Sequence, residues 1–296
     1  MTLTLAVTSF LFEATNGQRL NQKPDNAKRK IMELRRQQQH GFDYVDEGQG
    51  PVLLLLHGLF GALSNWQDVV EEFSAEYRVI IPVLPVYDMP LLQATVPGLV
   101  AYVENFVDKL QLPSSFALLG NSLGGHVALV YTLKNPGRVR RLVLTGSSGL
   151  FEDGMGGSFP KRGDYNFVRE RVGYTFYDPG VATKELVDEV FAVTNSNAKC
   201  LRMISIARSA QHHNLAGDLH RIAVPTLLVW GLNDTITPPS VAHDFERLLP
   251  QAELRFLDHC GHAPMMERPA GFNRYLASFM RRTAEQPAAL ATGPAR

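Results

Sequence analysis

The chain has 296 residues, of which 45% are hydrophobic and 20% charged, a composition that can bury a core and differs from that of disordered proteins. Lysine plus arginine equals aspartate plus glutamate at 29 each, and this zero net charge argues against nucleic-acid binding. Two cysteines are too few for a disulfide framework, and no apolar run reaches the about 20 residues of a membrane span, so we predict a cytoplasmic protein without a membrane span.

Residues 1–41 are predicted to form an extension that precedes the folded part of the chain. Leu3–Phe12 is mildly apolar, but no basic residue precedes it and no small-residue cleavage pattern follows it, so it is not interpreted as a signal peptide. A basic cluster spans residues 28–30, where a solvated helix or loose extension is favoured over a membrane-binding or nucleic-acid-binding tail. Residues 284–296 are rich in alanine and proline and are predicted to be a flexible tail.

From Phe42 onward, short apolar runs alternate with longer amphipathic stretches, which is typical of strands and helices that build a mostly parallel sheet. Runs without polar interruption indicate strands that are buried on both faces. The strand candidates are Val52–Leu56, Val79–Val83, Phe116–Leu119, Leu142–Thr145, Thr226–Trp230 and Glu253–Leu257. The helix candidates include Leu99–Leu110, Gly125–Asn135 and Val241–Leu249. We therefore predict an α/β core over residues 42–146 and 221–283.

Residues 147–220 interrupt this alternation, because they contain no convincing buried strand. Their second part has helical spacing, and an insertion of this length between two strands is best explained as a cap or lid. Their first part is rich in glycine and in aromatic residues, namely Phe151, Phe159, Tyr165, Phe167, Tyr174, Phe176 and Tyr177. This aromatic content predicts an apolar or aromatic small-molecule substrate.

The sequence Gly120-Asn121-Ser122-Leu123-Gly124 stands between a strand candidate and a helix candidate. The turn between the two elements must be sharp, and glycines on both sides leave room for a strained central residue. Ser122 would then lie at a helix N-terminus, where backbone N–H groups stabilise developing negative charge. A turn that needs glycine for its geometry alone is the alternative. We assign Ser122 as the candidate nucleophile, ahead of Ser147 and Ser148, which lack this spacing.

An acyl-transfer enzyme needs two N–H groups directed at the oxyanion of its tetrahedral intermediate. One is assigned to Leu123, the residue after the candidate nucleophile. The second is assigned to Leu59, which lies in the loop His57-Gly58-Leu59-Phe60-Gly61 after an early strand candidate, and Phe60 is the alternative donor. His57 is interpreted as a residue that braces this loop rather than as a general base, because the loop holds no acid to orient it.

A serine hydroxyl needs a general base, and the base needs an acid that orients it. Asp234 follows one strand candidate and His262 follows the next, so both lie at the carboxyl ends of parallel strands, where sites are built. The chain order Ser122, Asp234, His262 is that of one known class of serine hydrolase. Asp258 and His259 are the alternative acid and base, but they lie nearer a strand end and have less reach.

Metal and thiol chemistry are both disfavoured by the sequence. A metal site could use His212, His213 and His220 with Asp218, but adjacent histidines diverge on a helix and no His-Glu-x-x-His pattern occurs. Cys260 stands near the candidate base but has no base of its own, which argues against a cysteine nucleophile. We therefore expect no metal.

Four motifs in order carry a family resemblance, which extends from residue 42 to residue 282. They are His57-Gly58-Leu59-Phe60-Gly61, Gly120-Asn121-Ser122-Leu123-Gly124-Gly125, Leu228-Val229-Trp230-Gly231-x-x-Asp234 and Gly261-His262. Together they resemble the α/β-hydrolase fold family. The resemblance implies an eight-stranded, mostly parallel sheet flanked by helices, a Ser-His-Asp triad, a two-amide oxyanion hole and no cofactor.

Within that family the chain is most similar to esterases and carbon–carbon bond hydrolases that carry a helical cap. Relatives that cleave epoxides or carbon–halogen bonds have aspartate at the position of Ser122. The chain departs from the family after the strand candidate Val79–Val83, where the family usually has Asp-x-x-Gly-x-Gly. Here the sequence is Leu84-Pro85-Val86-Tyr87-Asp88-Met89-Pro90, so the resemblance does not specify the shape of the pocket at this segment.

The sequence thus predicts a serine hydrolase that acts on a carboxylic ester or related acyl substrate through an acyl-enzyme. Two alternatives use the same triad, namely hydrolysis of a carbon–carbon bond in a diketone, and acyl transfer to another acceptor or perhydrolysis. A third alternative is a ligand receptor that keeps the fold without catalysis. The sequence leaves both a monomer and a homodimer open.

Overall fold

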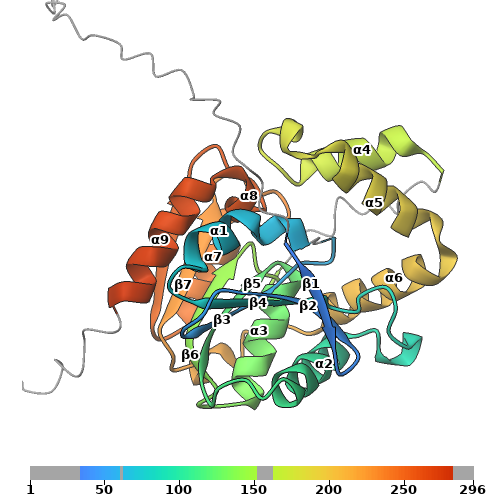
Figure 1. Cartoon of the computed structure of the whole chain (residues 1–296). Helices are drawn as coiled ribbons and strands as arrows, with labels where there is room; N and C mark the ends of the chain where they lie inside the picture. Colours follow the sequence, from blue (N-terminus) through green and yellow to red (C-terminus); the bar gives the residue numbers. More distant parts are fainter. Residues whose placement is uncertain (1–33, 61–62, 152–162, 283–296) are drawn as a thin grey trace, which may run out of the picture. The chain divides into compact units, whose positions relative to one another are not determined.

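Eight strands form one sheet in the order β1-β2-β4-β3-β5-β6-β7-β8 in the computed structural model, which describes residues 34–60, 63–151 and 163–282 (Figure 1). β1 pairs antiparallel with β2, β2 pairs antiparallel with β4, and the remaining neighbours pair in parallel. The strands are β1 (Arg36–Gln39), β2 (Phe42–Glu47), β3 (Val52–Leu56), β4 (Arg78–Pro82), β5 (Phe116–Asn121), β6 (Val139–Thr145), β7 (Thr226–Gly231) and β8 (Ala252–Leu257). The predicted fold class, a mostly parallel eight-stranded sheet, is confirmed.

The sheet begins before Phe42, within the residues predicted to be an extension. β1 pairs with β2 through a turn at His40 and Gly41, which both have positive φ angles of 53° and 82°. All four residues of β1 are exposed, and β2 alternates buried and exposed positions only in part. These strands lie at one edge of the sheet, so they need no continuous apolar run, which is the signal that identified the central strands.

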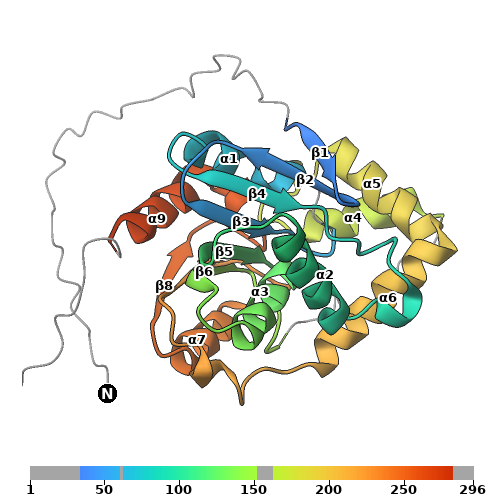
Figure 2. The same ribbon diagram turned by 60° about the horizontal axis from the view of Figure 1, so that its bottom comes forward.

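Helices cover both faces of the sheet (Figures 1 and 2). α2, α3 and α7 supply one hydrophobic cluster with residues of β3, β5, β6 and β7. α1 contacts β4 and α9, and α9 contacts β7 and β8 on the other face. The helices of the core are α1 (Gln67–Phe73), α2 (Val96–Lys109), α3 (Leu123–Lys134), α7 (Pro239–Leu248), α8 (Pro264–Glu267) and α9 (Pro269–Arg282).

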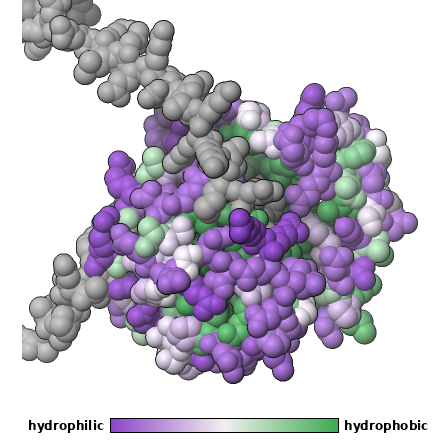
Figure 3. Space-filling view, in the orientation of Figure 1, coloured by the Kyte–Doolittle hydropathy of each residue, from purple (hydrophilic) through white to green (hydrophobic). Residues whose placement is uncertain are grey.

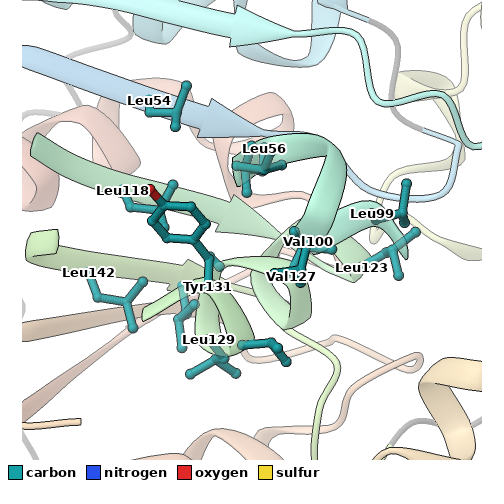
Figure 4. Packing of buried hydrophobic residues seen from close by; sticks show 14 of the residues in the cluster. Leu54, Leu56, Leu99, Val100, Leu118, Leu123, Val127, Leu129, Tyr131 and Leu142 are labelled. Carbon is teal, nitrogen blue, oxygen red and sulfur yellow. The ribbon is translucent and has the colours of Figure 1, made fainter. Parts of the chain in front are cut away.

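The core that supports the centre of the sheet is built from alternate strand residues and one face of α3. Leu54, Leu118 and Leu142 project from three neighbouring strands toward Val127 and Tyr131 of α3 (Figure 4). All five side chains are 2% exposed or less. Burial of a side chain of this size contributes about 1.5–3 kcal/mol, so this layer fixes α3 and the residues at its N-terminus on the sheet.

Three helices are inserted between β6 and β7 and form the predicted helical cap: α4 (Tyr165–Tyr174), α5 (Lys184–Asn195) and α6 (Asn197–His212). Each begins at a residue whose side-chain oxygen accepts a hydrogen bond from a first-turn N–H group, which stabilises that end of the helix. The capping residues are Asp164, Thr183 and Ser196. The predicted aromatic part of the cap includes Phe159, which lies outside the described residues, as do residues 1–33 of the predicted extension and the predicted tail, residues 284–296.

Hydrophilic residues predominate on the face of the protein drawn in Figure 3, with apolar groups scattered between them. Among the helices within residues 34–282 that the structure describes, none has the length and apolar character needed to cross a membrane. Cys200 and Cys260 are free thiols, and both are buried.

Candidate active site

Ser122 joins the end of β5 to the start of α3 and has φ 53° and ψ −119°. A residue other than glycine rarely adopts a positive φ, so the surrounding structure must enforce this turn. The flanking glycines permit it, because a β-carbon on Gly120 would collide with the carbonyl oxygen of Gly124. A β-carbon on Gly124 would collide with the carbonyl oxygen of Leu56 in β3. The two glycines therefore let α3 approach the sheet closely enough to present Ser122.

Leu123 is the first residue of α3, so its N–H group lies in the helical turn that has no intrahelical acceptor. The carbonyl oxygen of Ser122 accepts hydrogen bonds from the N–H groups of Gly125 and His126 at 3.0 and 3.2 Å. These bonds form the first turn of α3, which begins at the residue after Ser122. The helix dipole also favours negative charge at this end, as a developing oxyanion requires.

The loop after β3 lies against the serine. A β-carbon on Gly58 would lie 3.2 Å from the β-carbon of Ser122, so the glycine lets the loop approach the serine closely. His57 is buried and accepts a hydrogen bond from the Leu84 N–H group at Nε2 (2.9 Å), while its Nδ1 lies 2.8 Å from the Gly58 carbonyl oxygen and donates to it. Burial lowers the pKa of His57, which keeps the ring neutral for these two roles. These contacts give His57 the bracing position that the sequence indicated.

Asp234 and His262 lie side by side in the loops after β7 and β8. The Nδ1 atom of His262 lies 2.9 Å from Oδ2 and 3.1 Å from Oδ1 of Asp234. Both residues are buried, at 3% and 6% exposure. A carboxylate accepts a proton-bearing Nδ1, so this pairing leaves Nε2 of His262 with its lone pair. An imidazole base that is oriented by an acid would require this arrangement.

Three residues that the sequence did not single out hold this pair in place. Thr237 donates to Asp234 through its backbone N–H and its hydroxyl, each at 2.9 Å. Asn121 donates from Nδ2 to the carbonyl oxygen of His262 at 3.2 Å, and Glu267 accepts the Gly261 N–H at 2.8 Å. The Asp-x-x-Thr spacing was a readable signal, because aspartate accepts bonds from residues just after it in a turn. The contacts of Asn121 and Glu267 depend on the tertiary fold.

The alternative acid and base lie elsewhere. Asp258 and His259 pair with each other at 2.9 Å, with side chains 70% and 57% exposed, and His259 packs against the ring of Tyr177. Neither lines the cavity that contains Ser122. Cys260 is fully buried, and burial raises the pKa of its thiol, so the thiolate form is disfavoured. These three residues are therefore poorly placed for the roles considered for them.

A cavity of about 410 Å³ contains Ser122, His262, Leu59 and Leu123 on its wall. This volume lies within the range of about 300–1,000 Å³ that small-molecule sites occupy. Most of the wall is apolar and comes from the cap, including Phe167, Phe176, Val172, Val190, Met203 and Ile206. Arg171 and Arg208 of the cap also line it, and no aspartate or glutamate does within the part of the chain described.

The histidines considered for a metal site do not gather into one. His213 instead stacks on His126 of α3, with ring centroids 5.2 Å apart and the facing nitrogens at 3.2 Å. Asp218 pairs with Arg221 at 2.7 Å. Within residues 34–60, 63–151 and 163–282, no three histidine, cysteine, aspartate or glutamate residues are grouped so that they could hold a metal ion.

A profile of the alpha/beta hydrolase family matches residues 53–275 of the chain. The chain belongs to this family. An alpha/beta hydrolase enzyme from the metagenome of sediments of the Mar Chica lagoon, Morocco, is 39% identical, with a TM-score of 0.70 over 84% of this chain and 99% of that one. The membership confirms both the predicted family and the prediction of an enzyme.

Two curated relatives illustrate the reactions catalysed by proteins that are similar to this hydrolase in sequence. A pimeloyl-[acyl-carrier protein] methyl ester esterase of Nitrosomonas europaea is 28% identical over 76% of the chain and 94% of its own length. A 2-hydroxy-6-oxo-2,4-heptadienoate hydrolase of Pseudomonas putida is also 28% identical, over 79% of the chain and 91% of its own length. An esterase and a dienoate hydrolase are thus both among the relatives.

Proposed function

We propose that this hydrolase cleaves carboxylic esters with an apolar acyl or aromatic group, with Ser122, His262 and Asp234 as its catalytic residues. The observation that carries the proposal is the buried Asp234–His262 pair, 2.9 Å apart, whose imidazole shares a cavity wall with a serine held at positive φ. The esterase among the relatives and the apolar cap wall support the choice of substrate class.

In the proposed mechanism, His262 Nε2 takes the proton of the Ser122 hydroxyl as Oγ attacks the ester carbonyl carbon. The carbonyl π electrons move to the oxygen, and the N–H groups of Leu59 and Leu123 donate to this oxyanion. Collapse of the intermediate expels the alcohol, which receives the proton from His262, and leaves an acyl-enzyme. Water, deprotonated by His262, then releases the acid and regenerates Ser122. Asp234 orients the ring and stabilises its protonated form.

The test is the Ser122→Ala variant, assayed with nitrophenyl esters graded by acyl length and aromaticity. We expect kcat to fall by about 10⁴-fold or more, because loss of the nucleophile disables the whole mechanism. A fluorophosphonate should label the wild-type enzyme at Ser122 and leave the variant unlabelled. Ser240→Ala changes an exposed serine on α7 and is the matched control. Ester turnover by Ser122→Ala within tenfold of the wild type would refute the proposal.

A second candidate is hydrolysis of a carbon–carbon bond in a diketone that bears a carboxylate. It is favoured by the dienoate hydrolase among the relatives and by Arg171 and Arg208, the only charged side chains on the described cavity wall apart from the candidate base. Arginine forms strong paired hydrogen bonds with carboxylates. Comparison of kcat/KM for a 2-hydroxy-6-oxo-dienoate and for the best ester decides between the two. A hundredfold preference for the dienoate would replace ester hydrolysis as the proposed function.

A further inference from the structure

The segment Leu84–Pro90 departs from the usual family sequence. It contacts the loop at residues 57–60 that carries the candidate oxyanion donor Leu59, called here the donor loop. The hydroxyl of Tyr87 donates a hydrogen bond to the carbonyl oxygen of Leu59 at 2.5 Å. The backbone carbonyl is an acceptor of fixed position, so a hydrogen bond from the Tyr87 hydroxyl can hold the loop in place. The contact joins two stretches of chain that are 28 residues apart.

This hydrogen bond fixes the orientation of a peptide plane in the loop. Among the described residues no peptide bond is cis, so each carbonyl points away from the N–H group of the same plane. Tyr87 therefore sets the plane that carries the N–H of Phe60, while His57 sets the preceding plane, which carries the N–H of Leu59. The two planes meet at the α-carbon of Leu59, so a rotation of one disturbs the other.

The ring of Tyr87 is packed rather than free. With Leu59 and Phe60 it lies against a cluster of the cap residues Val193, Cys200 and Met203. Arg202 of α6 also donates from Nε to the Met89 carbonyl oxygen at 2.6 Å, which ties the same segment to the cap. A phenol on an anchored ring loses little conformational entropy when it makes its hydrogen bond.

The hydroxyl also keeps its proton over the working range of an ester hydrolase. Burial, and secondarily the nearby carboxylate of Glu189, raise the pKa of Tyr87. The group thus remains a donor in alkaline solution, where the general base of a serine hydrolase is fully active.

We propose that Tyr87 is a positioning residue. It holds the Leu59–Phe60 peptide and, through the α-carbon of Leu59 that the two planes share, keeps the Leu59 N–H, the second oxyanion donor, in the geometry that the transition state requires. The inference rests on the proposed function. In this view the atypical segment Leu84–Pro90 stabilises the donor loop on the side that faces the cap. A donor aimed in advance costs no reorganisation during the reaction, so its effect falls on kcat rather than on substrate binding.

The test compares Tyr87→Phe with Tyr102→Phe. Tyr102 also donates from a partly buried hydroxyl to a backbone carbonyl, that of Val83 at 3.0 Å, which lies outside the donor loop, so it is the matched control. We expect Tyr87→Phe to lower kcat by about 10- to 100-fold, somewhat less than loss of a whole donor, with KM within twofold. Inhibition by a trifluoromethyl ketone, which forms an oxyanion on Ser122, should weaken by the same factor. Tyr102→Phe should change neither value, and 3-fluorotyrosine at position 87, which keeps the hydroxyl, should restore kcat.

Thermal unfolding of each variant separates positioning from simple destabilisation. Unchanged kcat and unchanged ketone inhibition in Tyr87→Phe would overturn the inference while Ser122-dependent turnover still supports the proposed function. Equal losses in both variants, in proportion to their melting temperatures, would also overturn it. Turnover that is independent of Ser122 in the wild type would overturn the proposed function and the inference together.

Discussion

At the residue scale, the proposed chemistry depends on a few side chains whose orientation is restricted by their hydrogen bonds. The carboxylate of Asp234 accepts bonds from Ile236 and Thr237 as well as from His262. With these partners the carboxylate has little freedom to rotate, so it holds the imidazole of His262 in one orientation. A general base that is already oriented loses less entropy on reaching the reactive geometry.

Asp234→Asn should separate this orienting role from binding. Asparagine can donate to Nδ1 of His262 and so favours the tautomer with its proton on Nε2, which cannot accept the serine proton. We expect kcat for ester hydrolysis to fall by about 10³–10⁴-fold with little change in KM. Asp258→Asn, at the exposed alternative acid, should stay within twofold of wild type. A larger loss for Asp258→Asn than for Asp234→Asn would reverse the assignment of the acid.

The buried His126 gives a second prediction at this scale. Burial, together with the nearby His213, lowers the pKa of His126 to about 3. Between the ordinary value of about 6.5 and this value, the unfolded chain binds a proton that the folded protein does not. This group should therefore lower stability as pH falls through that window, by at most about 1.4 kcal/mol per pH unit.

Urea unfolding at pH 7, 6 and 5 tests this. His126→Gln removes the titrating group, so its free energy of unfolding should fall less steeply with decreasing pH than that of the wild type. His220→Gln changes an exposed histidine and should retain the wild-type slope. Identical slopes in the wild type and His126→Gln would show that His126 is not held neutral by the fold.

At the element scale, the position of α3 against β3 sets the position of Ser122. Gly124→Ala would place a methyl group against the carbonyl oxygen of Leu56, a backbone atom that cannot turn aside. We expect a loss of about 2 kcal/mol or more in the free energy of unfolding, together with reduced ester turnover. Gly217→Ala meets nothing within 4 Å and should change stability by no more than about 0.5 kcal/mol. Chemical denaturation of both variants checks the comparison.

The same scale shows which elements a sequence reveals. The central strands were predictable because burial on both faces requires unbroken apolar runs, and α2 and α7 because their apolar residues repeat along one face. α3 is buried nearly all round and shows no such face. β1 was not predictable, since its exposed residues Arg36–Gln39 carry no apolar signal and gain their partner only from the sheet. The order of Ser122, Asp234 and His262 could be read from the ends of strands. The bond from Tyr87 to Leu59 could not, because it depends on how two loops are folded against each other.

At the scale of the whole molecule, the cap and the core contribute different residues to the wall of the cavity. The core contributes Ser122 and His262, while the cap contributes most of the apolar wall. Substrate preference can therefore be altered on α6 without disturbing the candidate catalytic residues. Ala207 lines the cavity, whereas Ala198 on the same helix is exposed.

Ala207→Leu should narrow the range of esters accepted. The larger side chain occupies cavity space, so kcat/KM for long acyl chains should fall by about 10-fold or more, while acetate esters should be turned over as before. Ala198→Leu adds the same group to the exposed face and should leave the whole ester series unchanged. An equal loss for short and long esters in Ala207→Leu would instead indicate damage to the site itself.

The position of the cap in the chain has a consequence for biosynthesis. Ser122 and the donor loop precede α4–α6. Asp234 and His262 follow these helices, in the loops after β7 and β8, the two strands that complete one side of the sheet. Proteins are made from the N-terminus, at about 5–20 residues per second, and fold as they emerge. A ribosome-bound chain therefore displays its proposed nucleophile for several seconds before the base exists. Under the proposed function, the nascent protein should therefore be inert toward esters until its last two strands have joined the sheet.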